Sequence, residues 1–556
     1  MKHYELLFII LSCYCIFACV SQKQIATKPQ IISSGFVKKQ LTNTEWQDWQ
    51  HKDIAKDSIA GISLDKAYEC LKNIKGDTVL VAVLDTRLIK GNEDLKNLLW
   101  TNKDEIPNNN IDDDKNGYID DIHGWNFLGN KNGAQEYRAN FEFVRVIRKF
   151  DPLFKGKKRQ NIKDTVNYDI YTKAKRTLQD EIHIVNQNIL YLDSVKALRS
   201  ETKKELSKFY PDISLDVKVL DSMLRTEKDS TIIKKIIFLK EYDSNKQWYV
   251  NRYKRERRHL EIYYNKDYKE RSVIKDNSND LTDINYGNPT IFSDSIYPKH
   301  THSIKVVSVL AANRTNNYGI KGVTNSSKIM MVTVSPFGDE HDKDIALGIR
   351  YAVDNGAKII NITFTKYFSL HSDWVREAIK YASRNNVLIV CSAGNYSKNL
   401  DNETPYPNDT DTTGNEVVDN LMMIGSSTPF ANEFLVSDYS NYGKKNVDIF
   451  APGEFIYTSI GKNNYNFTSG TSYSAPIVSG IAALIRSHYP NLTAAEVKQI
   501  IMKSGVSYDI MVNKPSTSKE KELVPFSSLS KSGKIVNAYN ALLMAEEVSK
   551  KKKKRN

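Results

Sequence analysis

Short apolar runs rich in β-branched residues recur along this chain of 556 residues, and they constrain its fold more than any other feature. The runs lie at Thr78–Leu84 (TVLVAVL), Ile329–Val334, Lys358–Ile362, Val387–Cys391 and Leu421–Ile424. Between them, apolar residues recur at the spacing of helices, for example at Ile345, Ile349, Ala352 and Val353. Strands that alternate with helices in this way predict an α/β fold, with a parallel sheet covered by helices on both faces.

One long segment breaks the alternation. Residues 157–210 and 212–286 contain neither Gly nor Pro. Apolar residues recur there at helical spacing, which predicts two or more long amphipathic helices: Ile182, Val185, Ile189, Leu192 and Val195. We predict that residues 131–297 form a helical insertion in the α/β domain. Its basic, aromatic stretch Tyr249–His259 could bind a partner, or it could be a solvated helix face with snorkelling side chains.

The N-terminus has the features of an export signal. Its apolar block, Leu6 to Phe17, is too short to span a membrane and is followed by Ala18 and Cys19. A cysteine at this place resembles the lipobox of bacterial lipoproteins. We therefore predict a signal peptide at residues 1–19, and an exported lipoprotein that Cys19 anchors to a membrane, facing the periplasm or the cell surface. A plain secretory signal is the alternative.

Charge and cysteine content limit the classes of function. With Cys19 lipidated and the signal removed, only Cys70 and Cys391 remain, which excludes a disulfide scaffold. Part of the net charge of +13 belongs to a basic tail at residues 549–556, which is either solvated or in contact with an anionic surface. Because the chain is predicted to be exported, we expect no nucleic-acid partner.

Ser472 stands in the stretch FTSGTSYSAP, directly before a helical pattern that runs from Ile477 to Tyr489. Pro476 suits the first turn of that helix. Unpaired N–H groups and the positive end of the helix dipole lie at such a place, and they favour a nucleophile that creates negative charge. Ser472 is therefore a candidate nucleophile, and a serine that only caps the helix is the alternative.

A serine nucleophile needs a histidine base that a buried carboxylate orients. Asp85 ends an apolar strand, at the edge where ligands of a parallel sheet gather, and is the candidate carboxylate. His300 and His302 precede the helical pattern Ile304–Ala312 and are the candidate bases, although a histidine there can also be a polar cap. Asn395 follows the fourth apolar run, and its amide could stabilise an oxyanion or simply fill a left-handed turn.

These residues follow one another in the order Asp, His, Asn, Ser, and the order of the triad is that of subtilisin. Three stretches resemble motifs of the subtilisin-like serine peptidases, or subtilases: VAVLDT (81–86), AGN (393–395) and SGTSYSAP (469–476). Supporting matches lie at residues 319–323, 355–361, 440–443 and 451–453. The resemblance covers roughly residues 61–130 and 298–548, which we take as the catalytic domain, after an N-terminal linker at residues 20–60.

The resemblance implies a subtilisin-like fold and a serine endopeptidase that hydrolyses peptide bonds of a protein or peptide substrate through an acyl-enzyme, without a catalytic cofactor. It implies that Ser472 attacks, His302 accepts the proton, Asp85 fixes the imidazole tautomer and Asn395 stabilises the oxyanion. His302 is chosen over His300 because the family's motif aligns from it without a gap. The residues implied to contact substrate are Thr363, Phe364, Thr365, Ser392, Ala393 and Gly394.

The sequence departs from the family pattern beside three of these positions. Arg87 replaces a Gly after Asp-Thr, Ser303 and Ile304 replace Gly and Thr beside the base, and Thr365 replaces a Gly in the substrate-binding strand. None of these changes removes a chemical group of the mechanism, so they affect specificity more than catalysis. A β-branched Thr365 is expected to narrow the site.

Two other functions stay open at this point. One is a catalytically inactive relative that binds peptides or a partner at the membrane, and the other is a membrane-tethered scaffold built on the insertion. The insertion could also gate the cleft, since it separates Asp85 from His302 by 217 positions. The segment before the core is short for the inhibitory prodomain of the family, so we predict none.

A separate acidic stretch, DDDKNGYIDDIH (112–123), resembles a calcium loop. Asp112, Asp114, Asn116 and Asp120 place oxygen atoms at the spacing of calcium ligands, and Gly117 allows the turn. His123 stands at the twelfth position, where a bidentate Glu is expected. The stretch is therefore either a structural calcium site or a polar surface turn.

Overall fold

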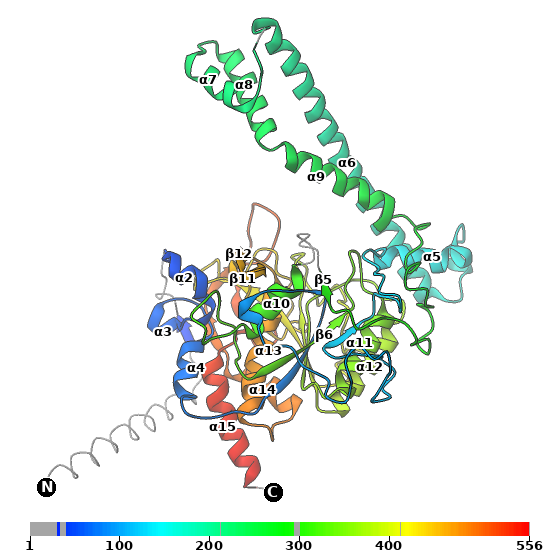
Figure 1. Ribbon diagram of the computed structural model, residues 1–556, viewed down its shortest axis with the longest axis vertical. Coiled ribbons are helices and arrows are strands. Elements are labelled where there is room, and N and C mark those ends of the chain that lie inside the picture. The colour runs from blue at the N-terminus through cyan, green and yellow to red at the C-terminus, as the bar shows by residue number, and fades with distance from the viewer. Residues whose placement is uncertain (1–30, 34–39, 212, 294–300, 412, 555–556) are drawn as a thin grey trace, which may run out of the picture. The chain divides into compact units, whose positions relative to one another are not determined.

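The structure is a computed structural model that describes residues 31–33, 40–211, 213–293, 301–411 and 413–554 (Figure 1). The chain forms two compact units. The α/β unit comprises the described parts of Met1–Tyr137, Arg271–Pro336 and Glu340–Asn556. The helical unit comprises Arg138–Glu270 and Phe337–Asp339.

A ten-stranded sheet forms the centre of the α/β unit, in the order β1-β13-β16-β10-β9-β8-β7-β2-β6-β4. The predicted apolar runs are its central, mutually parallel strands: β9 (Leu421–Ser427), β8 (Leu388–Ser392), β7 (Ile359–Ile362), β2 (Val79–Asp85) and β6 (Ser327–Thr333). The outer strands are β1 (Ile31–Ser33), β13 (Val506–Asp509), β16 (Lys534–Ile535), β10 (Ile449–Pro452) and β4 (Gly124–Asn126). Among the described strand pairs of this sheet, only β13 and β16 are antiparallel.

Helices cover both faces of the sheet, because side chains alternate along each buried strand. Val81 and Val83 of β2 face the layer that holds α4 (Leu64–Cys70), α10 (His302–Ala311), α13 (Thr471–His488), α14 (Ala494–Ser504) and α15 (Ala538–Lys553). Ala82 and Leu84 face the layer that holds α11 (Asp342–Asp354) and α12 (Ser372–Arg384). Within the first layer, α10 and α13 lie side by side (Figure 1). The predicted α/β fold is confirmed.

The segment predicted as a linker contains three short helices after residue 42: α2 (Asn43–Asp48), η1 (Trp49–His51) and α3 (Ile54–Asp57). The Trp49 side chain is fully buried, and its indole N–H donates to the main-chain oxygens of Glu454 (3.2 Å) and Phe455 (3.3 Å). This part of the segment therefore packs into the same core as the sheet.

Short elements complete the α/β unit: β3 (Leu88–Ile89), η2 (Glu93–Leu95), β5 (Phe292–Ser293), β11 (Ile456–Gly461), β12 (Asn464–Thr468), β14 (Met511–Asn513), β15 (Leu523–Pro525) and η5 (Phe526–Ser528). Among the described residues, no helix is both long and apolar enough to cross a membrane. The predicted signal peptide and Cys19 lie outside the described residues. Lipidation therefore stays a prediction.

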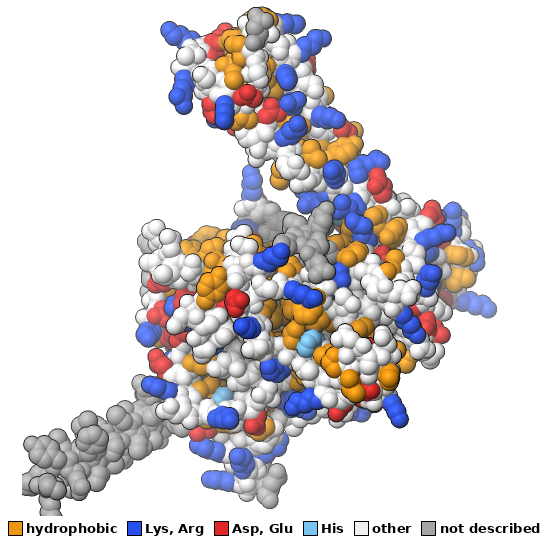
Figure 2. Space-filling model, viewed as in Figure 1, with side chains coloured by type: hydrophobic (Ala, Val, Ile, Leu, Met, Phe, Trp, Pro, Cys, Tyr) orange, Lys and Arg blue, Asp and Glu red, His pale blue; other side chains and the backbone are white. Residues whose placement is uncertain are grey.

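The helices of the helical unit all lie within residues 131–297, the range predicted for the insertion, whereas Phe337–Asp339 of this unit lie outside it. Its elements are α5 (Glu142–Phe154), η3 (Arg159–Asn161), α6 (Thr165–Phe209), α7 (Val217–Thr226), α8 (Ser230–Ser244), α9 (Lys246–Arg258) and the π-helix η4 (His259–Tyr263). Residues 138–270 hold 31 Lys and Arg against 20 Asp and Glu, so this segment accounts for most of the chain's net positive charge. Lys and Arg side chains are numerous on the face seen in Figure 2. Residues 271–293 belong to the α/β unit.

Candidate active site

Asp85 is the last residue of β2, and its side chain is almost fully buried, with 1% exposed. Its carboxylate accepts hydrogen bonds from the Thr86 main-chain N–H at 2.6 Å, from His302 Nδ1 and from the Thr363 hydroxyl. Burial alone would raise the pKa of Asp85, but the His302 ring and these donors lower it below its ordinary value. Asp85 is therefore held as a carboxylate in one fixed place.

His302 is the first residue of α10, and its Nδ1 lies 2.9 Å from both carboxylate oxygens of Asp85. One third of its side chain is exposed. Burial alone would lower the pKa of His302, but the Asp85 carboxylate outweighs this effect and raises it. Because Nδ1 donates to Asp85, the neutral ring keeps Nε2 unprotonated as a proton acceptor. His300 lies outside the described residues.

Ser472 is the second residue of α13 and is 8% exposed. The helix therefore begins six residues before the start that periodicity predicted at Ile477, and Pro476 lies inside it. Gly470 precedes the helix with a φ of 153°, a backbone conformation that favours glycine. The Ser472 hydroxyl donates to the main-chain oxygen of Thr363 at 3.0 Å.

Asn395 follows β8, and its orientation is set by its carbonyl oxygen. The main-chain N–H and the hydroxyl of Thr471 both donate to Asn395 Oδ1 at 2.9 Å. The Gly394 N–H donates to the same hydroxyl at 3.1 Å. The Asn395 Nδ2 amide is thereby turned toward Gly470, where an added Cβ would lie 3.5 Å from it. The amide group of the exposed Asn395 side chain thus lies near Gly470, the residue that precedes the helix carrying Ser472.

The six residues predicted to contact substrate follow two neighbouring strand ends. Thr363, Phe364 and Thr365 come directly after β7, while Ser392 ends β8 and precedes Ala393 and Gly394. Thr363 also makes two contacts that the sequence did not predict. Its hydroxyl donates to Asp85, and its main-chain oxygen accepts a hydrogen bond from Ser472. The order of the strands in the sheet would have predicted the contact with Asp85. Because β2 and β7 are neighbours, the residue that follows β7 lies beside the last residue of β2.

Two of the residues that depart from the family pattern, Arg87 and Ser303, stabilise the turn after Asp85. The Ser303 hydroxyl donates to the main-chain oxygen of Arg87 at 2.7 Å. The Arg87 guanidinium donates to the main-chain oxygen of Phe292 at 3.1 Å and to the Tyr137 hydroxyl at 2.8 Å. These contacts join the turn to the first turn of α10 and leave the His302–Asp85 pair in place.

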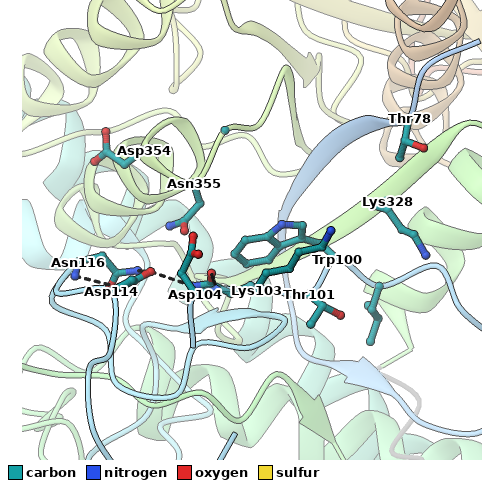
Figure 3. A pocket seen from close by; sticks show the side chains of 13 residues that line it. Thr78, Trp100, Thr101, Lys103, Asp104, Asp114, Asn116, Lys328, Asp354 and Asn355 are labelled. Atoms are coloured by element: carbon teal, nitrogen blue, oxygen red, sulfur yellow. Dashed lines mark hydrogen bonds between the residues drawn. The ribbon is translucent and has the colours of Figure 1, made fainter. Parts of the chain in front are cut away.

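The side chains predicted as calcium ligands in the acidic loop have different hydrogen-bond partners. Asp112 and Asp120 accept hydrogen bonds from main-chain N–H groups of their own loop at 2.9–3.2 Å. Asn116 turns its amide nitrogen toward Asp114 at 3.0 Å, beside a cavity of about 810 Å³ (Figure 3). The carboxylates of Glu105, Asp114 and Asp121 gather within 4.8 Å of one another, and oxygen atoms of this kind suit calcium. Calcium binding stays a prediction.

Known proteases share parts of this sequence. The chain is similar to the cell wall-associated protease of Bacillus subtilis (strain 168), with 35% identity over 204 residues, which cover 36% of this chain and 21% of the relative. It is also similar to the major intracellular serine protease of that strain, with 34% identity over 201 residues, which cover 35% of this chain and 58% of the relative. The chain thus spans less than two thirds of either relative.

A solved structure titled "Structural basis of subtilase cytotoxin SubAB assembly" is similar with a TM-score of 0.38 and 24% identity, covering 47% of this chain and 81% of that chain. The sequence profile of the subtilase family matches residues 76–521, which is well over half of the chain. Asp85, His302, Asn395 and Ser472 all lie in that range. The resemblance drawn from the motifs is thereby confirmed, and the chain belongs to the subtilase family.

Proposed function

We propose that this subtilase is a serine endopeptidase that cleaves protein or peptide substrates with Ser472, His302 and Asp85 as its catalytic triad. The observation that carries the proposal is the imidazole of His302, which a buried carboxylate holds at Nδ1 while its other nitrogen stays available as a base. Ser472, in the first turn of α13, supplies the hydroxyl. The protease names of the relatives support the same class of reaction.

The mechanism begins when the Ser472 hydroxyl leaves the Thr363 carbonyl and turns to His302 Nε2. Catalytic hydrogen bonds of this kind often form only once substrate is bound. Ser472 Oγ then attacks the scissile carbonyl carbon, and its proton passes to Nε2. The oxyanion is stabilised by Asn395 Nδ2 and by N–H groups at the start of α13.

The imidazolium then protonates the leaving amine, and the C–N bond breaks to give an acyl-enzyme. Water replaces the amine, His302 takes one of its protons, and hydrolysis of the ester regenerates the Ser472 hydroxyl. Asp85 keeps its charge throughout and stabilises the imidazolium.

Labelling with a fluorophosphonate tests the proposal, because the probe reacts with an activated serine and needs no knowledge of the natural substrate. We expect the folded wild-type protein to be labelled at Ser472, as mapped by peptide mass spectrometry, and Ser472→Ala and His302→Ala to stay unlabelled. Samples are tested with and without calcium. An unlabelled wild-type protein under both conditions would support the inactive relative instead.

The pH dependence of hydrolysis is a second prediction. Only neutral His302 can accept the serine proton, so kcat/KM is expected to fall as the pH is lowered through the pKa of His302. Since Asp85 raises this pKa above the ordinary value of 6.5, the midpoint should lie above pH 6.5. NMR titration of His302 in Ser472→Ala should show the same raised pKa, and adding Asp85→Asn should lower it. A His302 pKa that is insensitive to Asp85→Asn would contradict the assignment.

Export, lipid anchoring at Cys19 and calcium binding belong to the proposal as sequence-based predictions. Incorporation of labelled palmitate in a bacterial host, compared between wild type and Cys19→Ala, tests the anchor. Partner binding or cleft gating by the helical unit also stays a prediction.

A further inference from the structure

The space beside Ser472 lies between two chain segments that part after adjacent strands. β7 and β8 are paired up to Ile362 and Cys391, and beyond this pair the chain continues as residues 363–367 on one side and 392–396 on the other. Ser472 Oγ contacts the first segment at the Thr363 oxygen, and Asn395 belongs to the second. An acyl group on Ser472, with its oxygen at the Asn395 amide, therefore lies over the gap between the segments.

The side chain of Thr365 bridges this gap. Its hydroxyl donates to the main-chain oxygen of Ser392 at 2.6 Å, which ties the two segments together. Gly394 faces the same gap, and a Cβ added to it would lie 3.5 Å from Thr365 Cβ and 3.5 Å from the Tyr367 hydroxyl oxygen. The same Cβ would lie 2.6 Å from Asn441 Nδ2, so the space at Gly394 is filled already.

Buried contacts hold both segments, 363–367 and 392–396, in place; these segments form the two walls of the gap. Lys366 is fully buried, its ammonium lies 2.8 Å from an Asp342 carboxylate oxygen, and its main chain exchanges two hydrogen bonds with Tyr406. On the other wall, the buried Asn441 amide donates to the Ala393 oxygen at 2.7 Å and to the Tyr367 hydroxyl at 2.6 Å. Because buried charge pairs and satisfied amides are costly to separate, neither wall is free to move aside for a larger side chain.

We propose that Thr365 closes the pocket for the substrate side chain on the amino side of the scissile bond, so that the enzyme accepts only glycine or alanine there. The inference rests on the proposed function, since it concerns the acyl group on Ser472. It identifies Thr365 as the residue that determines specificity, because its side chain fills the gap that a larger substrate side chain would need.

Peptidyl phosphonates that differ only in the side chain next to phosphorus measure this selectivity without a known substrate. We expect the wild-type protein to react at least about 10²-fold faster with the alanine analogue than with the phenylalanine analogue, a ratio that a restrictive pocket can produce. Thr365→Gly should open the gap and lower this ratio at least tenfold. Thr365→Val is the matched control: it keeps the volume but lacks the hydroxyl, so it should retain the preference for alanine.

Fluorophosphonate labelling and a thermal melt of each variant separate the possible failures. If the fluorophosphonate does not label the wild-type protein, the proposed function fails and this inference fails with it. If the fluorophosphonate labels Ser472 but the alanine and phenylalanine analogues react equally fast, only the inference is overturned. It is also overturned if folded Thr365→Gly keeps the wild-type ratio, or if none of the phosphonates reacts with a protein that the fluorophosphonate labels.

Discussion

Replacement of Ser472 by alanine is expected to lower kcat for a peptide substrate by about 10⁶-fold, the scale found when the nucleophile of such a triad is removed. The hydroxyl forms the bond to the acyl group, and no other serine side chain among the described residues binds the Thr363 carbonyl at this point. The activity that remains should reflect binding and oxyanion stabilisation alone. The loss is measured as the rate of hydrolysis of a quenched fluorescent peptide. The rate is divided by the concentration of folded protein, because the variant cannot be quantified by labelling of Ser472.

The same prediction extends to a double variant. His302→Ala alone should cost about as much as Ser472→Ala, and the two together should cost little more, because residues that act as one unit give non-additive losses. Ser474→Ala is the matched control, since Ser474 lies in the same helix and is fully buried but donates to the Ala451 oxygen, away from His302. Losses that multiply in the double variant would show that the two residues act independently.

The centre of the fold could be predicted because a strand buried on both faces reads as a continuous apolar run. Asp85 and Asn395 could be predicted as site residues for a related reason, since Asp85 directly follows such a run and Asn395 lies on the turn after another. The start of α13 could not be predicted from periodicity. Residues 471–476 are mostly polar or small, and they are helical because they are buried within the unit, where tertiary packing overrides the local pattern.

Prediction of the two contacts of Thr363 would have required the order of the strands in the sheet, which cannot be read from the sequence. β2 and β7 are separated by more than 270 residues, and only their pairing brings Thr363 to Asp85. The same limit applies to the segment before residue 60. Its helices are short, and the sequence does not show that Trp49 is buried. The burial follows from contacts with residues 454 and 455, which lie far away in the sequence.

Asp85→Asn is expected to lower kcat by about 10⁴-fold while changing volume very little. In the wild-type protein the Thr86 N–H donates to Oδ1, and the Thr363 hydroxyl donates to Oδ2. An asparagine side chain has only one acceptor oxygen, and the Thr86 N–H would donate its hydrogen bond to it. The NH₂ group of the asparagine would therefore face His302 Nδ1. That amide would donate to Nδ1, and the proton of the neutral ring would then sit on Nε2, where it blocks transfer from Ser472.

KM is expected to stay within about threefold, because Asp85 is 1% exposed and lies beneath the imidazole, away from substrate. The comparison of kcat with KM therefore separates a wrong tautomer from a damaged binding site. Asp94→Asn provides a control, since Asp94 is equally buried in the α/β unit but binds Asn316 and Tyr465 instead of the base. If Asp85→Asn lowered kcat by less than tenfold in a folded protein, His302 would not depend on this carboxylate for its tautomer, and the triad assignment would have to be abandoned.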